Sequence, residues 1–154
     1  MAKSLFQVWI HAVWTVKNRA PVLSKSFRFE LFRHIKITAA KKGIYIDIIN
    51  GVEDHVHCLF MLKPTQTIAN VIKEIKGESS HWINEKNLIG GHFEWQVGYG
   101  AFSVSPKTAN NVRSYIYNQE KHHLIQGFEE EIQGFEDRID DNFKENIKDE
   151  DNLD

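Results

Sequence analysis

The spacing of hydrophobic residues at the start of the chain predicts a strand and then a helix. Residues 5–15 are rich in β-branched and aromatic side chains and are apolar on both faces, which is typical of a central strand. Residues 27–42 instead place apolar side chains three and four positions apart, which predicts an amphipathic helix. Gly43 follows directly and is expected to end that helix at its C′ position.

The next two segments return to a pattern typical of strands. Residues 44–50 and 55–61 are rich in β-branched residues, and Asn50-Gly51 between them is a strong turn signal. The two segments therefore predict a β-hairpin, with a turn a little longer than the two-residue minimum.

The second half of the chain predicts a helix, a strand and a further helix. Residues 67–84 carry apolar residues at helical spacing, and residues 93–104 are aromatic and punctuated by glycine, which suggests a last strand. Ser105 followed by proline is a helix start signal, so a helix is expected over 106–125, with Gly127 ending it.

This order of elements, β-α-β-β-α-β followed by a helix, is that of the split βαβ, or ferredoxin-like, arrangement. The predicted fold class is therefore α+β, with an antiparallel sheet, helices on one face and an extra C-terminal helix placed separately. We expect residues 1–127 to form a single domain, which is long enough for one hydrophobic core. Residues 128–154 are expected to form an acidic C-terminal tail.

Charge is unevenly distributed between these two parts. Residues 128–154 hold twelve acidic and three basic residues, a net charge of −9, whereas residues 1–127 hold nine acidic and sixteen basic residues, a net charge of +7. A basic body suits a polyanion such as nucleic acid. Many domains of similar charge bind nothing anionic, so charge alone leaves the partner open.

Cysteine content and hydropathy bear on the cellular setting. Cys58 is the single cysteine, so an internal disulfide is impossible, which favours a reducing, cytoplasmic environment. Gln7 and His11 interrupt the apolar run near the N-terminus, which we interpret as a strand and not as a signal peptide. No stretch approaches the roughly 18 consecutive apolar residues of a membrane span, so no membrane association is expected.

Two histidines in the predicted hairpin are the first candidates for chemistry. Side chains at positions i and i+2 of a strand project from the same face, so His55 and His57 point one way and Val56 the other. Two adjacent imidazoles can ligate a divalent metal ion. Two ordinary histidines on a solvated sheet face would explain the pattern too, so the motif alone leaves the choice open.

The last predicted helix contains the next candidates. Tyr115 and Gln119 are four residues apart and share a helix face, which His122 continues. Tyr117 lies about 200° from Tyr115 around a helix of 3.6 residues per turn, so it cannot share the same task. A lone tyrosine is most often structural, and the spacing alone assigns no role.

Two further segments allow both a functional and a structural interpretation. Gly98 and Gly100 could let a phosphate backbone approach closely, or they could mark a bulge before the last helix, which we favour. Lys73 and Lys76 could contact phosphates, and a solvated helix face explains them equally well.

Five segments together resemble the single-tyrosine HUH transposases, the very small enzymes of bacterial insertion sequences that move as single strands. The resemblance runs from about Trp9 to His123, in the family's order and spacing. The segments are HAVWTVKNRAPVL, NGVEDHVHCLF, IKGESSHWIN, FEWQVGYGAFSVS and VRSYIYNQEKHH. This collective match is far more specific than any single motif.

The resemblance implies a role for each candidate residue. His55 and His57 match the histidine pair of the HUH enzymes. Tyr115 matches the nucleophile, and Gln119 matches the third metal ligand. The implied activity is cleavage and rejoining of single-stranded DNA at hairpin-flanked element ends, through a 5′-phosphotyrosine intermediate. A homodimer is also implied, in which the tyrosine helix of one subunit can complete the active site of the other.

The expected cofactor is Mg²⁺, with Mn²⁺ able to substitute. Two imidazoles and one amide form a softer ligand set than Mg²⁺ usually prefers, so we predict that Mn²⁺ binds more tightly. A dimer also has a mechanistic reason, because one tyrosine per subunit means that two subunits are needed to hold two cut ends.

Three other interpretations compete with this one. A domesticated relative would use the same chemistry on repeated genomic hairpins, and the DNA around the gene would separate the two. A non-catalytic nucleic-acid-binding module would keep the basic surface without nicking, but all four candidate residues are present. A replication initiator or relaxase of the wider HUH group is usually larger than this chain.

Overall fold

Four strands form one antiparallel sheet in the order β2-β3-β1-β4. The computed structural model describes residues 4–125 and 127–136. The strands are β1 (Val8–Thr15), β2 (Tyr45–Gly51), β3 (His55–Leu62) and β4 (Gly100–Val104). The helices are α1 (Lys25–Lys41), α2 (Ile68–Glu85), α3 (Ala109–Tyr117), α4 (Gln119–Ile125) and α5 (Phe128–Glu136), and a 3-10 turn spans Lys17–Arg19. This is the α+β, split βαβ order that the sequence predicts.

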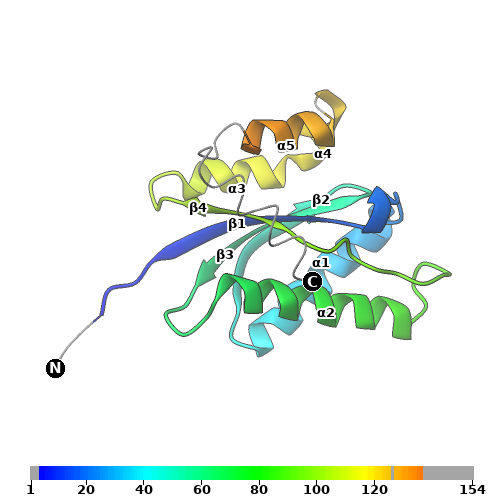
Figure 1. The fold of residues 1–154 in the computed structure, drawn as a ribbon, viewed down its shortest axis with the longest axis horizontal. Helices are drawn as coiled ribbons and strands as arrows, with labels where there is room; N and C mark the ends of the chain where they lie inside the picture. Colours follow the sequence, from blue (N-terminus) through cyan, green and yellow to red (C-terminus); the bar gives the residue numbers. More distant parts are fainter. Residues whose placement is uncertain (1–3, 126, 137–154) are drawn as a thin grey trace.

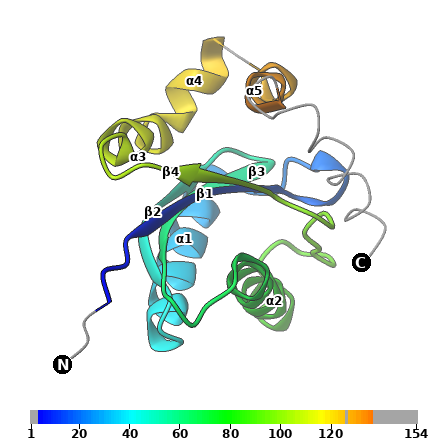
Figure 2. The ribbon, with the colours of Figure 1, turned by 60° about the vertical axis from the view of Figure 1, so that its left-hand side comes forward.

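Helices lie on both faces of the sheet (Figures 1 and 2). α1 and α2 cover one face, whereas α3, α4 and α5 lie over the other. β1 and β3 occupy the two central positions, where His57 pairs with Val13 and His55 with Thr15. Side chains that the central strands direct away from α1 and α2 therefore lie beneath α3, α4 and α5.

The main hydrophobic core lies between the sheet and the α1–α2 layer. Strand alternation sends Trp14, Val56, Cys58 and Phe60 to this side, where each is at most 1% exposed. Thr67 begins α2 as an N-cap, because its hydroxyl oxygen accepts a hydrogen bond of 3.2 Å from the backbone N–H three residues later.

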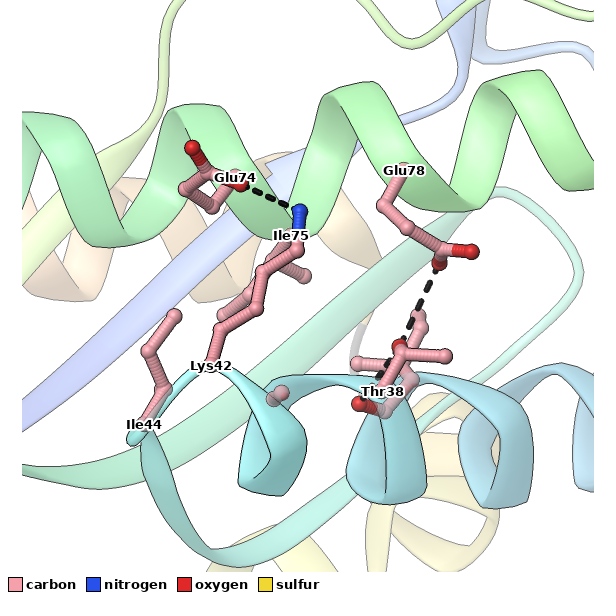
Figure 3. Close-up of a pocket in the computed structure, with 8 residues that line it drawn as sticks. Thr38, Lys42, Ile44, Glu74, Ile75 and Glu78 are labelled. Atoms are coloured by element: carbon pink, nitrogen blue, oxygen red, sulfur yellow. Dashed lines mark hydrogen bonds and ion pairs between the residues drawn. The ribbon is translucent and has the colours of Figure 1, made fainter.

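Polar side chains join α1 to α2 at the rim of this core (Figure 3). Lys42, which follows α1, contacts Glu74 at 2.5 Å, and the hydroxyl of Thr38 donates to Glu78 at 3.3 Å. The cavity beside them measures about 10 Å³, which is room for about one water molecule. This contact therefore serves packing, and the candidate chemistry lies on the other face of the sheet.

The predicted hairpin is present, with a connection slightly longer than two residues, but two local details differ. Residues 52–54 connect the strands, whereas Asn50 and Gly51 belong to β2 and pair with His57 and Val56 of β3. Glycine is needed at 51 because a Cβ atom there would lie 2.2 Å from the carbonyl oxygen of His55. The last strand is shorter than expected, since its continuous pairing with β1 covers Gly100–Val104.

The C-terminal helix also differs from the prediction. It starts at Ala109 because the four residues before it form a turn, which is closed by the N–H of Thr108 donating to Ser105 O at 3.0 Å. Asn118 (φ −95°, ψ 24°) is not helical and divides the helix into α3 and α4.

The segment predicted to be an acidic tail begins with a helix. Its first nine residues form α5, and residues 137–154 lie outside the described residues, so the predicted domain boundary stays a prediction. Among the helices in the described part of the chain, none combines the length and the apolar composition needed to cross a bilayer.

Candidate active site

Two buried histidines on β3 form the centre of the candidate site. Because side chains alternate along a strand, His55 and His57 leave the sheet on the α3–α5 side, while Val56 and Cys58 lie in the main core. Both histidines are 0% exposed, and their ring centroids lie 5.2 Å apart. Full burial of two polar rings argues against a solvated sheet face and indicates a preorganised functional site.

A different partner holds each histidine at its Nδ1 atom. Nδ1 of His55 donates to the Asp54 carboxylate at 2.7 Å. Nδ1 of His57 forms a hydrogen bond of 2.9 Å with Nε2 of His11, which projects from β1. Holding Nδ1 fixes the orientation of each ring and leaves Nε2 as the ligating atom, as in many metal sites.

The two Nε2 atoms face a carboxylate from α5. Oε1 of Glu131 lies 2.5 Å from Nε2 of His57 and 3.7 Å from Nε2 of His55. Oε2 of the same carboxylate lies 3.2 Å from Nε2 of His123, and Glu131 is only 3% exposed. The ligand atoms of His55, His57 and Glu131 all lie within 4.8 Å of one another, so these three residues could hold a metal ion.

Burial and neighbouring charges shift the pKa values of these groups. Burial lowers the pKa of His57 to about 4, although Glu131 acts in the other direction. Burial also opposes the charged form of His55, but hydrogen bonds to Asp54 and Glu131 outweigh it and raise the pKa of His55. For Glu131, burial favours the neutral form, yet contacts with three imidazoles hold the pKa of its carboxyl well below the usual range. These shifts favour an ionised Glu131 and a neutral His57, which are the states that bind a cation, whereas His55 would have to give up a proton to bind one.

Tyr115 of α3 lies beside the same histidines. Its ring centroid is 5.7 Å from that of His57, 6.1 Å from that of His11 and 4.5 Å from that of His122. Tyr117 is 72% exposed, in agreement with its predicted place on the opposite side of the helix. Of the two tyrosines in α3, Tyr115 is the one that the fold brings to the histidine pair.

Contacts with β2 hold α3 in this position. Asp47 lies at a bulge in β2, and its carboxylate accepts two hydrogen bonds, of 2.7 and 2.6 Å, from the guanidinium of Arg113. The side-chain amide of Asn50 donates to the last two carbonyl oxygens of α3, both at 3.0 Å. These contacts lie on both sides of Tyr115 along the helix.

Gln119, the first residue of α4, is fully buried. Neither polar atom of its amide has a hydrogen-bond partner among the described residues. The residues four positions before and after it are Tyr115 and His123, whose rings contact those of His57 and His55 respectively. A buried amide without a partner costs about 1–3 kcal/mol. Coordination of a cation would offset this cost, so Gln119 stays a candidate ligand.

Sequence reasoning names the histidine pair, Tyr115 and Gln119 as candidates, but it names neither Glu131 nor His123. His123 could be found, because it lies four residues after Gln119 and continues its helix face. Glu131 could not, because it is the last of three successive glutamates in a strongly acidic segment. Nothing in the local sequence distinguishes it from its neighbours.

The fold and the site together define a class of α+β domain, in which a central strand presents two buried histidines to a tyrosine on an overlying helix. The family profile described as "Transposase IS200 like" matches residues 4–119. The ISDra2 transposase TnpA of Deinococcus radiodurans is 30% identical over 122 residues, which cover 75% of this chain and 86% of that protein. The chain belongs to the IS200-like transposase family.

Two solved structures share the fold. A Deinococcus radiodurans R1 protein assigned as a transposase, solved at 1.90 Å, has a TM-score of 0.60 and 24% identity over 77% of this chain and 98% of that chain. The REP-associated tyrosine transposase bound to a REP hairpin has a TM-score of 0.57 and 19% identity over 80% of this chain and 73% of that chain. The family profile ends at residue 119, before His123 and Glu131.

Proposed function

We propose that this protein cleaves and rejoins single-stranded DNA, with Tyr115 as nucleophile and a divalent metal ion held by His55 and His57. The observation that carries the proposal is the position of Tyr115 against His57, on the face to which β3 directs both imidazoles. A buried cluster of paired polar groups is often no more stable than well-packed apolar side chains, so a binding role explains it better than packing does. Membership of a transposase family supports the same conclusion.

The reaction of Tyr115 is a transesterification. The phenolic oxygen attacks the scissile phosphorus, and the bond from phosphorus to the 3′ oxygen breaks. The phenol loses its proton, and the departing 3′ oxygen gains one. The products are a 5′-phosphotyrosine link and a free 3′-OH, and the retained bond energy lets rejoining proceed without ATP. Tyrosine has an ordinary pKa near 10, so at pH 7 only about one phenol in a thousand is ionised, and the site has to favour loss of the proton.

The donor atoms fit a divalent cation. His55 and His57 would hold it through Nε2, and Gln119 and Glu131 are the candidates for a third ligand. A bound divalent cation would withdraw charge from a phosphate oxygen and stabilise the leaving oxygen. We propose Mg²⁺ as the cellular metal and Mn²⁺ as an effective substitute, which we expect to tolerate the two imidazole nitrogens better than Mg²⁺ does.

We infer that the substrate is single-stranded DNA with hairpin ends. The REP-associated tyrosine transposase, which shares this fold, was solved with a REP hairpin. The net charge of +7 on residues 1–127 suits a polyanion of this kind. A domesticated relative would use the same chemistry, and the two are separated by asking whether hairpins flank the gene alone or recur throughout the genome.

We further propose that the protein acts as a homodimer. Each chain provides one Tyr115, and two cut ends need two tyrosines to hold them. In the structure, Tyr115 lies against His57 of its own chain. Sharing of active sites between subunits, as the family resemblance implies, would place α3 on the histidines of a second chain.

The proposal is tested by incubating the protein with single-stranded DNA from both flanks of the gene. We expect a protein–DNA adduct that resists denaturation, forms with Mn²⁺ or Mg²⁺ and is prevented by EDTA. Tyr115→Phe and His57→Ala should abolish it, whereas Tyr117→Phe, the matched control on the same helix, should retain it. An adduct that persists in Tyr115→Phe contradicts the assigned nucleophile. DNA binding without any adduct in the unmodified protein would indicate a non-catalytic binding module.

A further inference from the structure

The α5 helix places a carboxylate where a substrate would have to bind. α5 lies over the same face of the sheet as α3 and α4 (Figure 2). Glu131 directs one carboxylate oxygen to His57, at 2.5 Å, and the other to His123, at 3.2 Å. His55 and His57 are 0% exposed in this arrangement, so no phosphodiester can reach their Nε2 atoms.

The carboxylate resembles the reacting group of the proposed substrate. A carboxylate and a phosphodiester each present two oxygens that share one negative charge. Both accept charge-assisted hydrogen bonds and bind divalent cations through oxygen. Glu131 shows how such an anion fits here, with one oxygen on the β3 histidines and the other on His123 of α4.

A second contact from α5 to the body is weak. Arg19 lies 3.1 Å from Glu129, but the two side chains are 41% and 87% exposed. Exposed ion pairs contribute only about 0–1 kcal/mol. Of the polar contacts described for α5, those of the Glu131 carboxylate are therefore stronger than the Arg19–Glu129 pair, and competition for them by another anion would favour release of α5.

We propose that the carboxylate of Glu131 occupies the subsite of the scissile phosphate, and that His123 donates a hydrogen bond to that phosphate after α5 has moved away. α5 is then a competitor of DNA within the same chain. This inference rests on the proposed function, since it names the group that the same site binds.

The expected size of the effect follows from the occupancy of the subsite. When a segment covers a site, the apparent dissociation constant rises in inverse proportion to the uncovered fraction. If α5 covers the subsite nine-tenths of the time, removing the competing charge increases DNA affinity by about tenfold.

The first experiment measures DNA binding by the full chain with Tyr115→Phe, so that no covalent bond forms. The probe is a fluorescent single-stranded oligonucleotide from the gene flank, at saturating Mn²⁺, and the readout is the dissociation constant from anisotropy. Adding Glu131→Gln should tighten binding several-fold to about tenfold. Glu130→Gln, which removes the same charge from an exposed neighbour on α5, should change the dissociation constant for DNA less than twofold.

Two results would overturn the proposal. Equal tightening by Glu130→Gln and Glu131→Gln would mean that the effect is general charge repulsion and not occupancy of a subsite. Weaker DNA binding in Glu131→Gln at saturating Mn²⁺ would mean that Glu131 stays in place as a permanent ligand when DNA is bound.

A second experiment tests His123 in the Glu131→Gln background, in which residue 131 no longer presents a carboxylate to His123. His123→Ala should cancel most of the gain in DNA affinity while leaving Mn²⁺ binding within about twofold. His81→Ala, a control on α2 at the opposite face of the sheet, should leave the gain intact. Retention of the full gain in His123→Ala contradicts the assignment of His123.

Failure of this inference can be told apart from failure of the proposed function. In the first case, the adduct depends on Tyr115, and Glu131→Gln both loses the adduct and binds DNA more weakly. That result supports cleavage and contradicts the assignment of Glu131 to the phosphate subsite. In the second case, no adduct forms, and Glu131→Gln binds DNA more tightly while Glu130→Gln does not. That result contradicts cleavage and supports the assignment of Glu131 to the phosphate subsite.

Discussion

The two site histidines differ in what holds them. The carboxylate of Asp54 accepts from His55, whereas the ring of His11 bonds to His57. A carboxylate increases the basicity of the ligating nitrogen more than a neutral ring does, so His55 is expected to be the stronger ligand. Burial opposes ionisation of Asp54, but its hydrogen bond to His55 and the nearby charge of Arg19 keep its pKa below the usual value.

Asp54 provides a direct test of this residue-scale account. Asp54→Ala should lower Mn²⁺ affinity about 10- to 100-fold, because the His55 ring loses its orientation and part of its basicity. Asp54→Asn should lower Mn²⁺ affinity less, since an amide oxygen still accepts a hydrogen bond from Nδ1 of His55. Isothermal titration calorimetry measures both, with Glu53→Gln in the same loop as control. Unchanged Mn²⁺ affinity in Asp54→Ala would show that His55 needs no such partner.

The identity of the ligands also predicts a preference between metals. Two imidazoles favour Mn²⁺ over Mg²⁺, because Mg²⁺ prefers an all-oxygen, octahedral set and gives up water reluctantly. We expect Mn²⁺ to bind more tightly than Mg²⁺ in a competitive titration of the unmodified protein. Equal or weaker binding of Mn²⁺ would contradict the assignment of two histidine ligands.

At the residue scale, how far the site can be predicted depends on the range of the interaction. Strand alternation places His55 and His57 on one face, and helix spacing places Tyr115 and Tyr117 on different sides of the helix, because both rules are local. The contact of His11 with His57 joins residues 46 positions apart and depends on the register of two strands, which no local pattern encodes.

The β2–β3 hairpin is the element that sets the site geometry. It carries Asp47 and Asn50, which anchor α3, and it leads directly into His55. Its close packing depends on Gly51, the last residue of β2, because any Cβ atom there would collide with the carbonyl oxygen of His55 at 2.2 Å. A side chain at position 51 would therefore push directly on the backbone of His55 and Val56.

Two glycine substitutions test the importance of the hairpin. Gly51→Ala should destabilise the protein by about 3 kcal/mol, at the upper end of overpacking costs, and should weaken Mn²⁺ binding. Gly77→Ala is the matched control, because a Cβ atom at that position of α2 meets nothing within 4 Å. It should stabilise the protein by about 0.5–1 kcal/mol through the helix preference of alanine. Denaturant unfolding measures both, and an equal effect of the two substitutions would contradict the role of Gly51.

At the element scale, the fold class is predictable and several boundaries are not. Hydrophobic periodicity identifies the four strands and the long helices because each buries one continuous face. The break at Asn118 and the late start of α3 at Ala109 depend on tertiary contacts and turn geometry. α5 escapes prediction because its acidic sequence resembles a solvated segment, although Glu131 is buried against three histidines.

For the whole molecule, the central question is whether one chain or two chains build each active site. The structure brings Tyr115 to His57 within one chain. The family resemblance implies exchange of the tyrosine helix between subunits, and the need for two tyrosines per reaction favours a dimer.

Mixing two inactive variants distinguishes these arrangements. If active sites are shared, an equal mixture of Tyr115→Phe and His57→Ala should regain about a quarter of the adduct, because half of the dimers are mixed and each has one intact site. Circular dichroism should first show that both variants fold. If the mixture regains no adduct after subunit exchange, Tyr115 acts within its own chain.

The most direct measurement is the identity of the residue that carries DNA after reaction with a single-stranded flank. Trypsin should release residues 114–121 as one peptide, SYIYNQEK, which contains both tyrosines of α3. Tandem mass spectrometry of this peptide, after nuclease digestion of the DNA, locates the modification. A 5′-phosphonucleotide on Tyr115 is the predicted result. A nucleotide on Tyr117 or on any other residue would contradict the proposal that the histidine pair and Tyr115 form the catalytic centre.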